Sequence, residues 1–163
     1  MSATIIDGKA VAADIVDRVA GAAARFRAAQ GRAPGLAVAL VGENPASQVY
    51  VRNKGKKAEA CGFLSIQETL PATTAEETLL ALIADWNADD RIDGILVQMP
   101  LPDAIDADAV IRALTPEKDV DGFNVINIGK LCQEDPSAFV ACTPAGVVEL
   151  LKRSGVATSG QRV

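Results

Sequence analysis

Three short apolar runs constrain the fold of this chain more than any other feature. LAVALV (36–41) lies between two glycines and contains no polar residue, which is typical of a strand buried on both faces of a parallel sheet. LSIQETL (64–70) and GILVQMP (94–100) follow it, each after an interval long enough for a helical crossover. These runs predict three parallel strands joined by helices.

The segments before and between the runs have helical patterns. Residues 8–30 are rich in alanine, carry apolar residues at helical spacing and end at a GRAPG sequence. Asn44 can cap a second helix, because Pro45 suits the first helical position, where a missing N–H costs nothing. Thr73 or Thr74 is expected to cap a third helix.

Two further helices are predicted, over residues 106–114 and 143–155, whereas residues 119–135 have no clear pattern and are expected to form a long surface excursion. Strands that alternate with helices favour right-handed crossovers and a sheet covered on both faces. We therefore expect an α/β fold: a three-layer αβα domain with a mainly parallel sheet, and with the helix over residues 8–30 packed on one face. The 163 residues, 49% of them hydrophobic, suit one such domain.

Composition argues against several classes of function. The sequence has no histidine, which removes Ser-His-Asp and Cys-His catalysis, and Cys61, Cys132 and Cys142 form no CxxC pair, so no metal site is expected. A formal net charge of −5 with one Trp and one Tyr argues against a nucleic-acid partner. Because the sequence shows no run of about 18 apolar residues and no secretory signal, we expect no membrane partner and a cytoplasmic location.

Polar residues follow the predicted strands, where ligands bind in open α/β sheets. On a helix that begins at Pro45, Tyr50 and Lys54 are four residues apart and share a face. The same helix would turn Arg52 and Lys56 to solvent. The stripe that packs inward would consist of Val51, Gly55, Ala58 and Gly62. Tyr50 and Lys54 are therefore expected to border a cleft.

Two more positions can complete a site. Gln98 places an amide at the end of an apolar strand, where it must find a partner or line a pocket, unless it is simply a satisfied core glutamine. PEKDVDGF (116–123) supplies Asp119 and Asp121 beside a glycine that suits a tight turn. Taken alone, these acids could equally serve the turn itself.

Three segments together resemble a known family. VGENPASQVYVRNKGKKAEACGF, DGILVQMPLP and PEKDVDGFNVINIGKL, in this order and spacing, resemble regions of the methylenetetrahydrofolate dehydrogenase/methenyltetrahydrofolate cyclohydrolase family, and the similarity runs from Ile5 to the end of the chain. The resemblance implies oxidation of 5,10-methylenetetrahydrofolate with NADP and hydrolysis of the product to 10-formyltetrahydrofolate. It also implies a cytoplasmic homodimer in one-carbon metabolism, which serves purine and amino-acid biosynthesis.

The family's residue roles carry over to the matching positions. Tyr50 would stack on the folate and Lys54 would be the catalytic lysine, with Gln98 as its hydrogen-bonded partner. Asp121 would hold the pterin ring. The same resemblance adds to the substrate contacts Val97 and Met99. With no histidine in the chain, Lys54 is also the best-placed base for the hydrolysis.

The chain departs from the family at its C-terminal end. It stops where the family would enter an NADP-binding Rossmann domain, and it contains no GxGxxG phosphate loop. We therefore expect a folate-binding catalytic domain over residues 1–155, the start of the NADP-binding domain over 156–163, and no cofactor site in this chain. Two alternatives remain open: a folate-binding or dimer-forming module without catalysis, and an unrelated flavodoxin-like binding domain in which Lys54 is a solvated helix residue.

Overall fold

A small parallel sheet forms the centre of the structure, a computed structural model that describes residues 5–160. Strands β1 (Gly35–Val41), β2 (Leu64–Leu70) and β3 (Gly94–Gln98) lie in the order β2-β1-β3. Both strand pairs are parallel, and Leu40 of β1 pairs with Gln98 of β3. The prediction of three parallel strands is confirmed, although β3 ends two residues early, ahead of Pro100, which has no N–H to give to a ladder.

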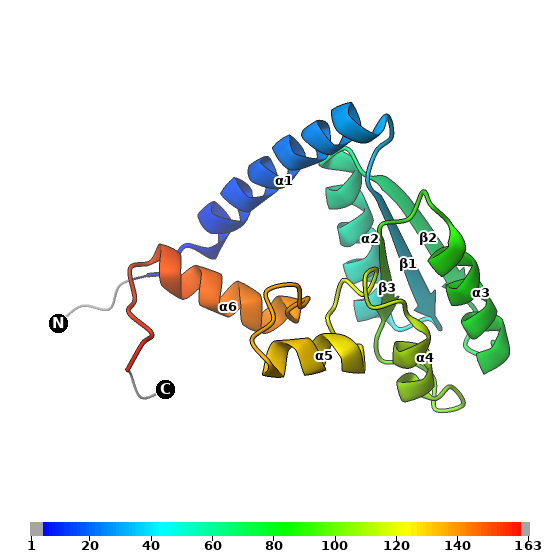
Figure 1. Cartoon of the computed structure of the whole chain (residues 1–163). Helices are drawn as coiled ribbons and strands as arrows, with labels where there is room; N and C mark the ends of the chain where they lie inside the picture. The colour runs from blue at the N-terminus through cyan, green and yellow to red at the C-terminus, as the bar shows by residue number, and fades with distance from the viewer. Residues whose placement is uncertain (1–4, 161–163) are drawn as a thin grey trace.

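Helices cover both faces of the sheet. In the described part of the chain they are α1 (Gly8–Gln30), α2 (Pro45–Ala60), α3 (Glu76–Ala88), α4 (Ala107–Ala113), α5 (Val125–Cys132) and α6 (Cys142–Arg153). Helix α2 lies on one face, and α3 and α4 lie on the other (Figure 1), which confirms the three-layer αβα arrangement. Among residues 5–160, none of these helices has the length and apolar character needed to span a bilayer.

The two faces of the sheet bury unequal cores. Toward α3 and α4 lies a large cluster that includes Ile83, Ile95 and Val110, all of them fully buried. The face toward α2 buries a smaller apolar cluster, made of Val38, Leu40, Val51 and Leu96. Because hydrophobic stabilisation is roughly proportional to the apolar area removed from water, the α3/α4 face supplies most of it.

Helix α2 packs as its sequence predicts except at Gly62, which lies beyond the end of the helix and is exposed. The Asn44 side chain caps it by accepting hydrogen bonds from two N–H groups of the first turn, at 3.0 and 3.2 Å. Its buried residues are Ser47, Val51, Gly55 and Ala58. Gly55 permits a close approach to β2, since a Cβ there would collide with the Gln67 side chain. Arg52 and Lys56 are exposed, as predicted.

The start of α3 differs from the prediction. Ala75 occupies the position before the helix and no side chain caps it, so the expectation that Thr73 or Thr74 is the cap was wrong. The Thr74 N–H instead donates to the Pro71 carbonyl at 3.0 Å, which places the two threonines in a turn before the helix.

Residues 119–135 are not a continuous irregular excursion, because α5 occupies much of this segment. Asn124 caps α5 by accepting a hydrogen bond from the Ile126 N–H at 2.9 Å. Asn127 holds the helix against the preceding loop by donating to the Asp119 carboxylate at 3.0 Å. The local apolar pattern does not reveal these tertiary contacts, which accounts for the wrong prediction.

Helix α1 has the predicted bounds but not the predicted packing. It ends at Gly31, whose φ of 72° is a left-handed conformation that glycine adopts at little cost. Ala23 is its one buried residue, so the expectation that α1 packs on the sheet was wrong. Figure 1 shows α1 and α6 extending away from the sheet on the same side, and an ion pair between Asp14 and Arg153 joins them.

Candidate active site

Lys54 of α2 meets Gln98 at the carboxyl end of β3. Lys54 Nζ donates to Gln98 Oε1 at 3.0 Å, and Gln98 Nε2 donates to the Met99 carbonyl at 2.7 Å. The second bond fixes the orientation of the amide, because only its NH₂ group can donate, and so directs the amide oxygen at Lys54. Both side chains are half-buried. The fold thus joins two residues that are far apart in the sequence into one polar pair.

Asp121 lies near this pair, on the loop between α4 and α5. Burial raises the pKa of its carboxyl group, the positive charge of Lys54 opposes this rise, and the negative charge of Asp119 adds to it. The net direction of the pKa is upward, because burial is the largest of the three effects. Lys54 and Asp121 also line the same hollow, so the two side chains share one site.

A hollow of about 760 Å³ opens beside these residues, between α1, α2 and the sheet. Lys54, Lys57 and Asp121 are its charged lining residues. Most of the wall is apolar and includes Ile15, Val16, Val19, Leu36, Leu96 and Val120. Its volume falls within the range of small-molecule pockets, about 300–1,000 Å³. Gln98 does not line the hollow itself, but it contacts Lys54, which does.

The other predicted site residues lie in three different settings. Tyr50 is 62% exposed, one helical turn before Lys54, and unlike Lys54 it does not line the hollow. The Val97 side chain is buried in the core toward α3 and α4, so only its backbone can face the site. Met99 is half-buried, and its carbonyl is the anchor of the Gln98 amide.

Cys142, at the start of α6, also borders the hollow, and the sequence analysis did not select it. Its thiol donates a hydrogen bond to the Val120 carbonyl at 3.5 Å. Burial and the charge of Asp121 raise the pKa of this thiol, which therefore stays protonated at neutral pH. Spacing along the sequence does not select Cys142, because only the fold brings it to Asp121.

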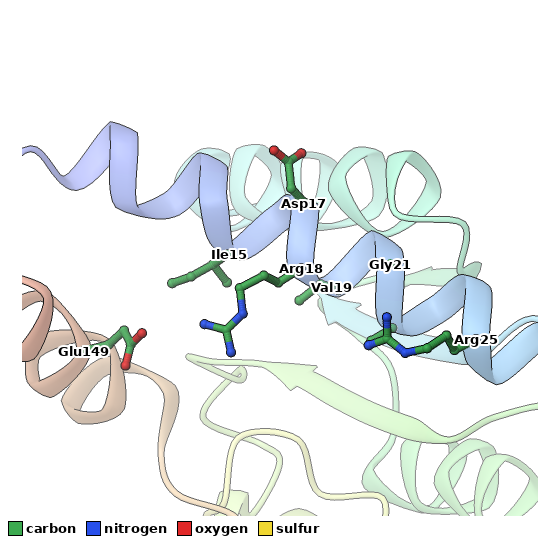
Figure 2. A pocket seen from close by; sticks show the side chains of 8 residues that line it. Ile15, Asp17, Arg18, Val19, Gly21, Arg25 and Glu149 are labelled. Carbon is green, nitrogen blue, oxygen red and sulfur yellow. The ribbon is translucent and has the colours of Figure 1, made fainter.

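A second hollow, of about 710 Å³, lies between α1 and α6 (Figure 2). Arg18, Arg25 and Asp17 line it from α1, and Glu149 lines it from α6, where Arg18 extends toward it. None of these four side chains is buried, and the two signs of charge offset each other. This hollow has no counterpart of the Lys54–Gln98 pair. Over residues 5–160, moreover, His, Cys, Asp and Glu form no group of three or more suited to a metal ion.

The fold and the site define an α/β domain that presents a lysine, an orienting amide and a carboxylate beside a pocket sized for a small organic molecule. The sequence model described as tetrahydrofolate dehydrogenase/cyclohydrolase, catalytic domain, matches residues 6–121. The chain therefore belongs to the tetrahydrofolate dehydrogenase/cyclohydrolase family. The alternative of an unrelated flavodoxin-like domain was wrong.

Relatives with high identity extend this match. Bifunctional protein FolD 1 of Mesorhizobium japonicum is 56% identical over 152 residues, which are 93% of this chain and 51% of the relative. Bifunctional protein FolD of Erythrobacter litoralis is 55% identical over 151 residues, which are 93% of this chain and 50% of the relative. The chain spans about half the length of these curated relatives.

Solved structures show the same fold. The bifunctional enzyme FolD of Campylobacter jejuni has a TM-score of 0.89 at 44% identity, covering 94% of this chain and 54% of that chain. A methylenetetrahydrofolate dehydrogenase-cyclohydrolase from Trypanosoma brucei, complexed with NADP cofactor and inhibitor, has a TM-score of 0.94 at 38% identity, covering 99% of this chain and 56% of that chain.

Proposed function

We propose that this chain supplies the folate-binding and catalytic residues of an enzyme that oxidises 5,10-methylenetetrahydrofolate and hydrolyses the methenyl product to 10-formyltetrahydrofolate. The observation that carries the proposal is the 3.0 Å bond between Lys54 and Gln98, formed beside Asp121 and the hollow. Three segments distant in sequence combine there into a base, an orienting amide and a carboxylate. The bifunctional relatives support the same assignment.

Asp121 and Tyr50 are suited to bind the substrate. One edge of a pterin ring carries neighbouring N–H donors, and an ionised carboxyl group such as that of Asp121 can accept two of them. The exposed Tyr50 ring offers a flat face for an aromatic part of the folate. The apolar wall of the hollow can then exclude water from the remaining ring surface. Val97 and Met99 would contribute through backbone groups next to Gln98.

Lys54 is suited to accept a proton during hydrolysis. The oxygen of a water molecule bonds to the methenyl carbon while the π pair of the C=N bond moves to nitrogen, and one proton of that water passes to the lone pair of Nζ. The carbon–N5 bond of this adduct then breaks, the remaining hydroxyl becomes the formyl C=O on N10, and N5 receives a proton. The positive charge of the methenyl substrate would repel a second positive charge placed beside it in a partly buried site. Gln98 Oε1 aims the amine while the Met99 carbonyl holds the amide in place.

NADP would accept the hydride in the oxidation, as the cofactor in the Trypanosoma structure suggests. None of the 13 glycines of this chain forms the GxGxxG spacing that binds a dinucleotide phosphate. We therefore assign no NADP contact to the residues of this chain. We propose that residues 1–155 are the folate-binding catalytic domain and that 156–163 lead into an NADP-binding domain; positions 1–4 and 161–163 lie outside the described residues.

A folate-binding module without catalysis is the second candidate, because the chain spans about half the length of its curated relatives. Two measurements separate the candidates: binding of folinic acid by calorimetry, and loss of methenyl absorbance during hydrolysis of 5,10-methenyltetrahydrofolate. We would assay this chain alone and joined to the second half of the Mesorhizobium relative. Hydrolysis that depends on Lys54 supports the enzyme, whereas binding without hydrolysis in both proteins supports the module.

We further propose that the protein is a cytoplasmic homodimer. The chain exposes 10502 Å², whereas a compact monomer of this mass exposes about 7,700 Å². Helices α1, α5 and α6 contribute to the difference, with one, one and no buried residue respectively. Sedimentation equilibrium over a range of concentrations tests the dimer, and a concentration-independent monomer mass would contradict it. Cell fractionation tests the location.

A further inference from the structure

Asp119 has a fully buried carboxyl group that none of the steps above uses. Its Oδ1 accepts a hydrogen bond from the Gly122 N–H at 3.1 Å. Its Oδ2 accepts two, from the Asn124 N–H at 2.8 Å and from Asn127 Nδ2 at 3.0 Å. A buried carboxylate requires such donors to offset its lost hydration. All three donors follow Asp121 in the sequence, so the Asp119 carboxylate closes a turn that contains Asp121.

The residues on either side of Asp121 are held tightly. Val120 packs directly on Gly94 of β3, where an added Cβ would collide with the Val120 side chain. Gly122 has a φ of 68°, and a Cβ added to it would lie 2.6 Å from the Phe139 carbonyl oxygen. The backbone of Asp121 is therefore fixed at both ends.

The beginning of the same turn is attached to the sheet and to α3. The Lys118 carbonyl accepts a hydrogen bond from the Ile95 N–H of β3 at 2.7 Å. Its ammonium donates to three carbonyls at the end of α3, at 3.1, 2.8 and 2.9 Å. Because β3 also carries Gln98, the turn that contains Asp121 is bonded to the same strand as Gln98.

We propose that Asp119 is a positioning residue, whose buried carboxylate holds the turn that presents Asp121 to the Lys54–Gln98 pair. The hydrogen bonds of the turn support this role directly. That the role matters for catalysis rests on the proposed function, in which Asp121 binds the pterin ring.

Asp119→Asn tests the inference, because an amide cannot accept from the same three donors. In this variant, hydrogen exchange at the Gly122 and Asn124 amides should accelerate by at least about tenfold. The pKa of Asp121, followed by carboxyl ¹³C NMR, should fall, because a like charge disappears and the turn admits water. Lys54 from α2 and Cys142 from α6 also face Asp121 and stay unchanged. Asp103→Asn, an exposed change of equal charge, is the control and should alter neither quantity.

A lower melting temperature of Asp119→Asn with unchanged exchange and unchanged Asp121 titration would overturn the inference. If Asp119→Asn does not fold, Gly122→Ala decides the question, because it strains the same turn and keeps Asp119. Faster Asn124 exchange and a shifted Asp121 titration are then expected, and no change in either would overturn the inference. The role of Asp121 itself is tested separately: equal affinity of wild type and Asp121→Asn for folinic acid would refute the proposed function and leave the geometric inference standing.

Discussion

The two faces of the sheet differ in how completely they are covered. The face under α3 and α4 is sealed by a large apolar cluster, with Leu79, Ile83 and Ile95 at 0% exposure. The face under α2 has a small cluster, and beside it lies the 760 Å³ hollow with Lys54 at its edge. The sealed face holds the fold together, whereas the open face carries the polar groups. Stability and chemistry should therefore respond to different substitutions.

Lys54→Met should produce the largest effect and act on the open face alone. The substitution keeps much of the side-chain length but removes the amine, so methenyl hydrolysis should fall by about 10²- to 10⁴-fold, the usual contribution of a general base. The hydrolysis rate is measured by loss of methenyl absorbance, with this chain joined to the second half of the Mesorhizobium relative. Lys56→Met, an exposed change on the same helix, should leave the rate nearly unchanged. A large loss of hydrolysis in Lys56→Met with a near-normal rate in Lys54→Met would contradict the assignment of Lys54 as the base.

Ile83→Ala should produce the corresponding effect on the sealed face. Removing a fully buried side chain leaves a cavity, and such changes typically lower the free energy of unfolding by about 2–5 kcal/mol. Urea denaturation measures it. Val148→Ala, on the largely exposed α6, should cost far less. Equal losses from the two variants would show that the α6 surface is covered in solution.

Gly94→Ala tests whether the two regions are coupled. A Cβ at this position would displace Val120, the neighbour of Asp121, and such overpacking should cost about 1–3 kcal/mol of stability. Affinity for folinic acid should fall together with stability, because Asp121 moves. Gly129→Ala, in α5 with no atom close to an added Cβ, should instead be neutral or slightly stabilising. An unchanged affinity of Gly94→Ala for folinic acid would show that packing at Gly94 does not influence the position of Asp121.

The smallest effect is expected at the ion pair of Arg32 and Asp93, at the amino-terminal edge of the sheet. The hydrogen-bonded guanidinium lowers the pKa of Asp93 below its usual value. The stability contributed by this shift is present above the unfolded pKa of about 3.9 and is lost as pH falls through the folded pKa. Asp93→Asn should remove this part of the acid dependence of the melting temperature. Both side chains are partly exposed, so high salt should weaken the effect.

The sequence predicted those parts of the fold that local patterns determine. The three strands and the inward stripe of α2 follow from apolar runs and helical spacing, and the structure confirms both, apart from Gly62 at the end of the stripe. The packing of α1 could not be predicted, because a helical stripe shows which side is apolar and not what covers it. Helix α5 was missed because long-range bonds, such as that between Asn127 and Asp119, hold it in place.

The site was predictable to a similar extent. Strand-end position and helical spacing selected Lys54, Gln98 and Tyr50, and the family resemblance supported the choice of Asp121 over Asp119. The contribution of Asp119 could not be predicted, because its three donors come together only in the folded turn. The same holds for Cys142, which reaches the hollow from another helix.

The hydrogen bond from Gln98 to the Met99 carbonyl has a consequence for the choice of amino acid at position 98. A glutamate would have nearly the same shape, but it would place a negative charge against the Lys54 amine, and its oxygen would face the Met99 carbonyl without a donor. Glutamine gives the lysine a fixed direction and adds no charge beside it. A neutral amide, anchored to the carbonyl of the next residue, therefore orients the lysine without changing the net charge of the site.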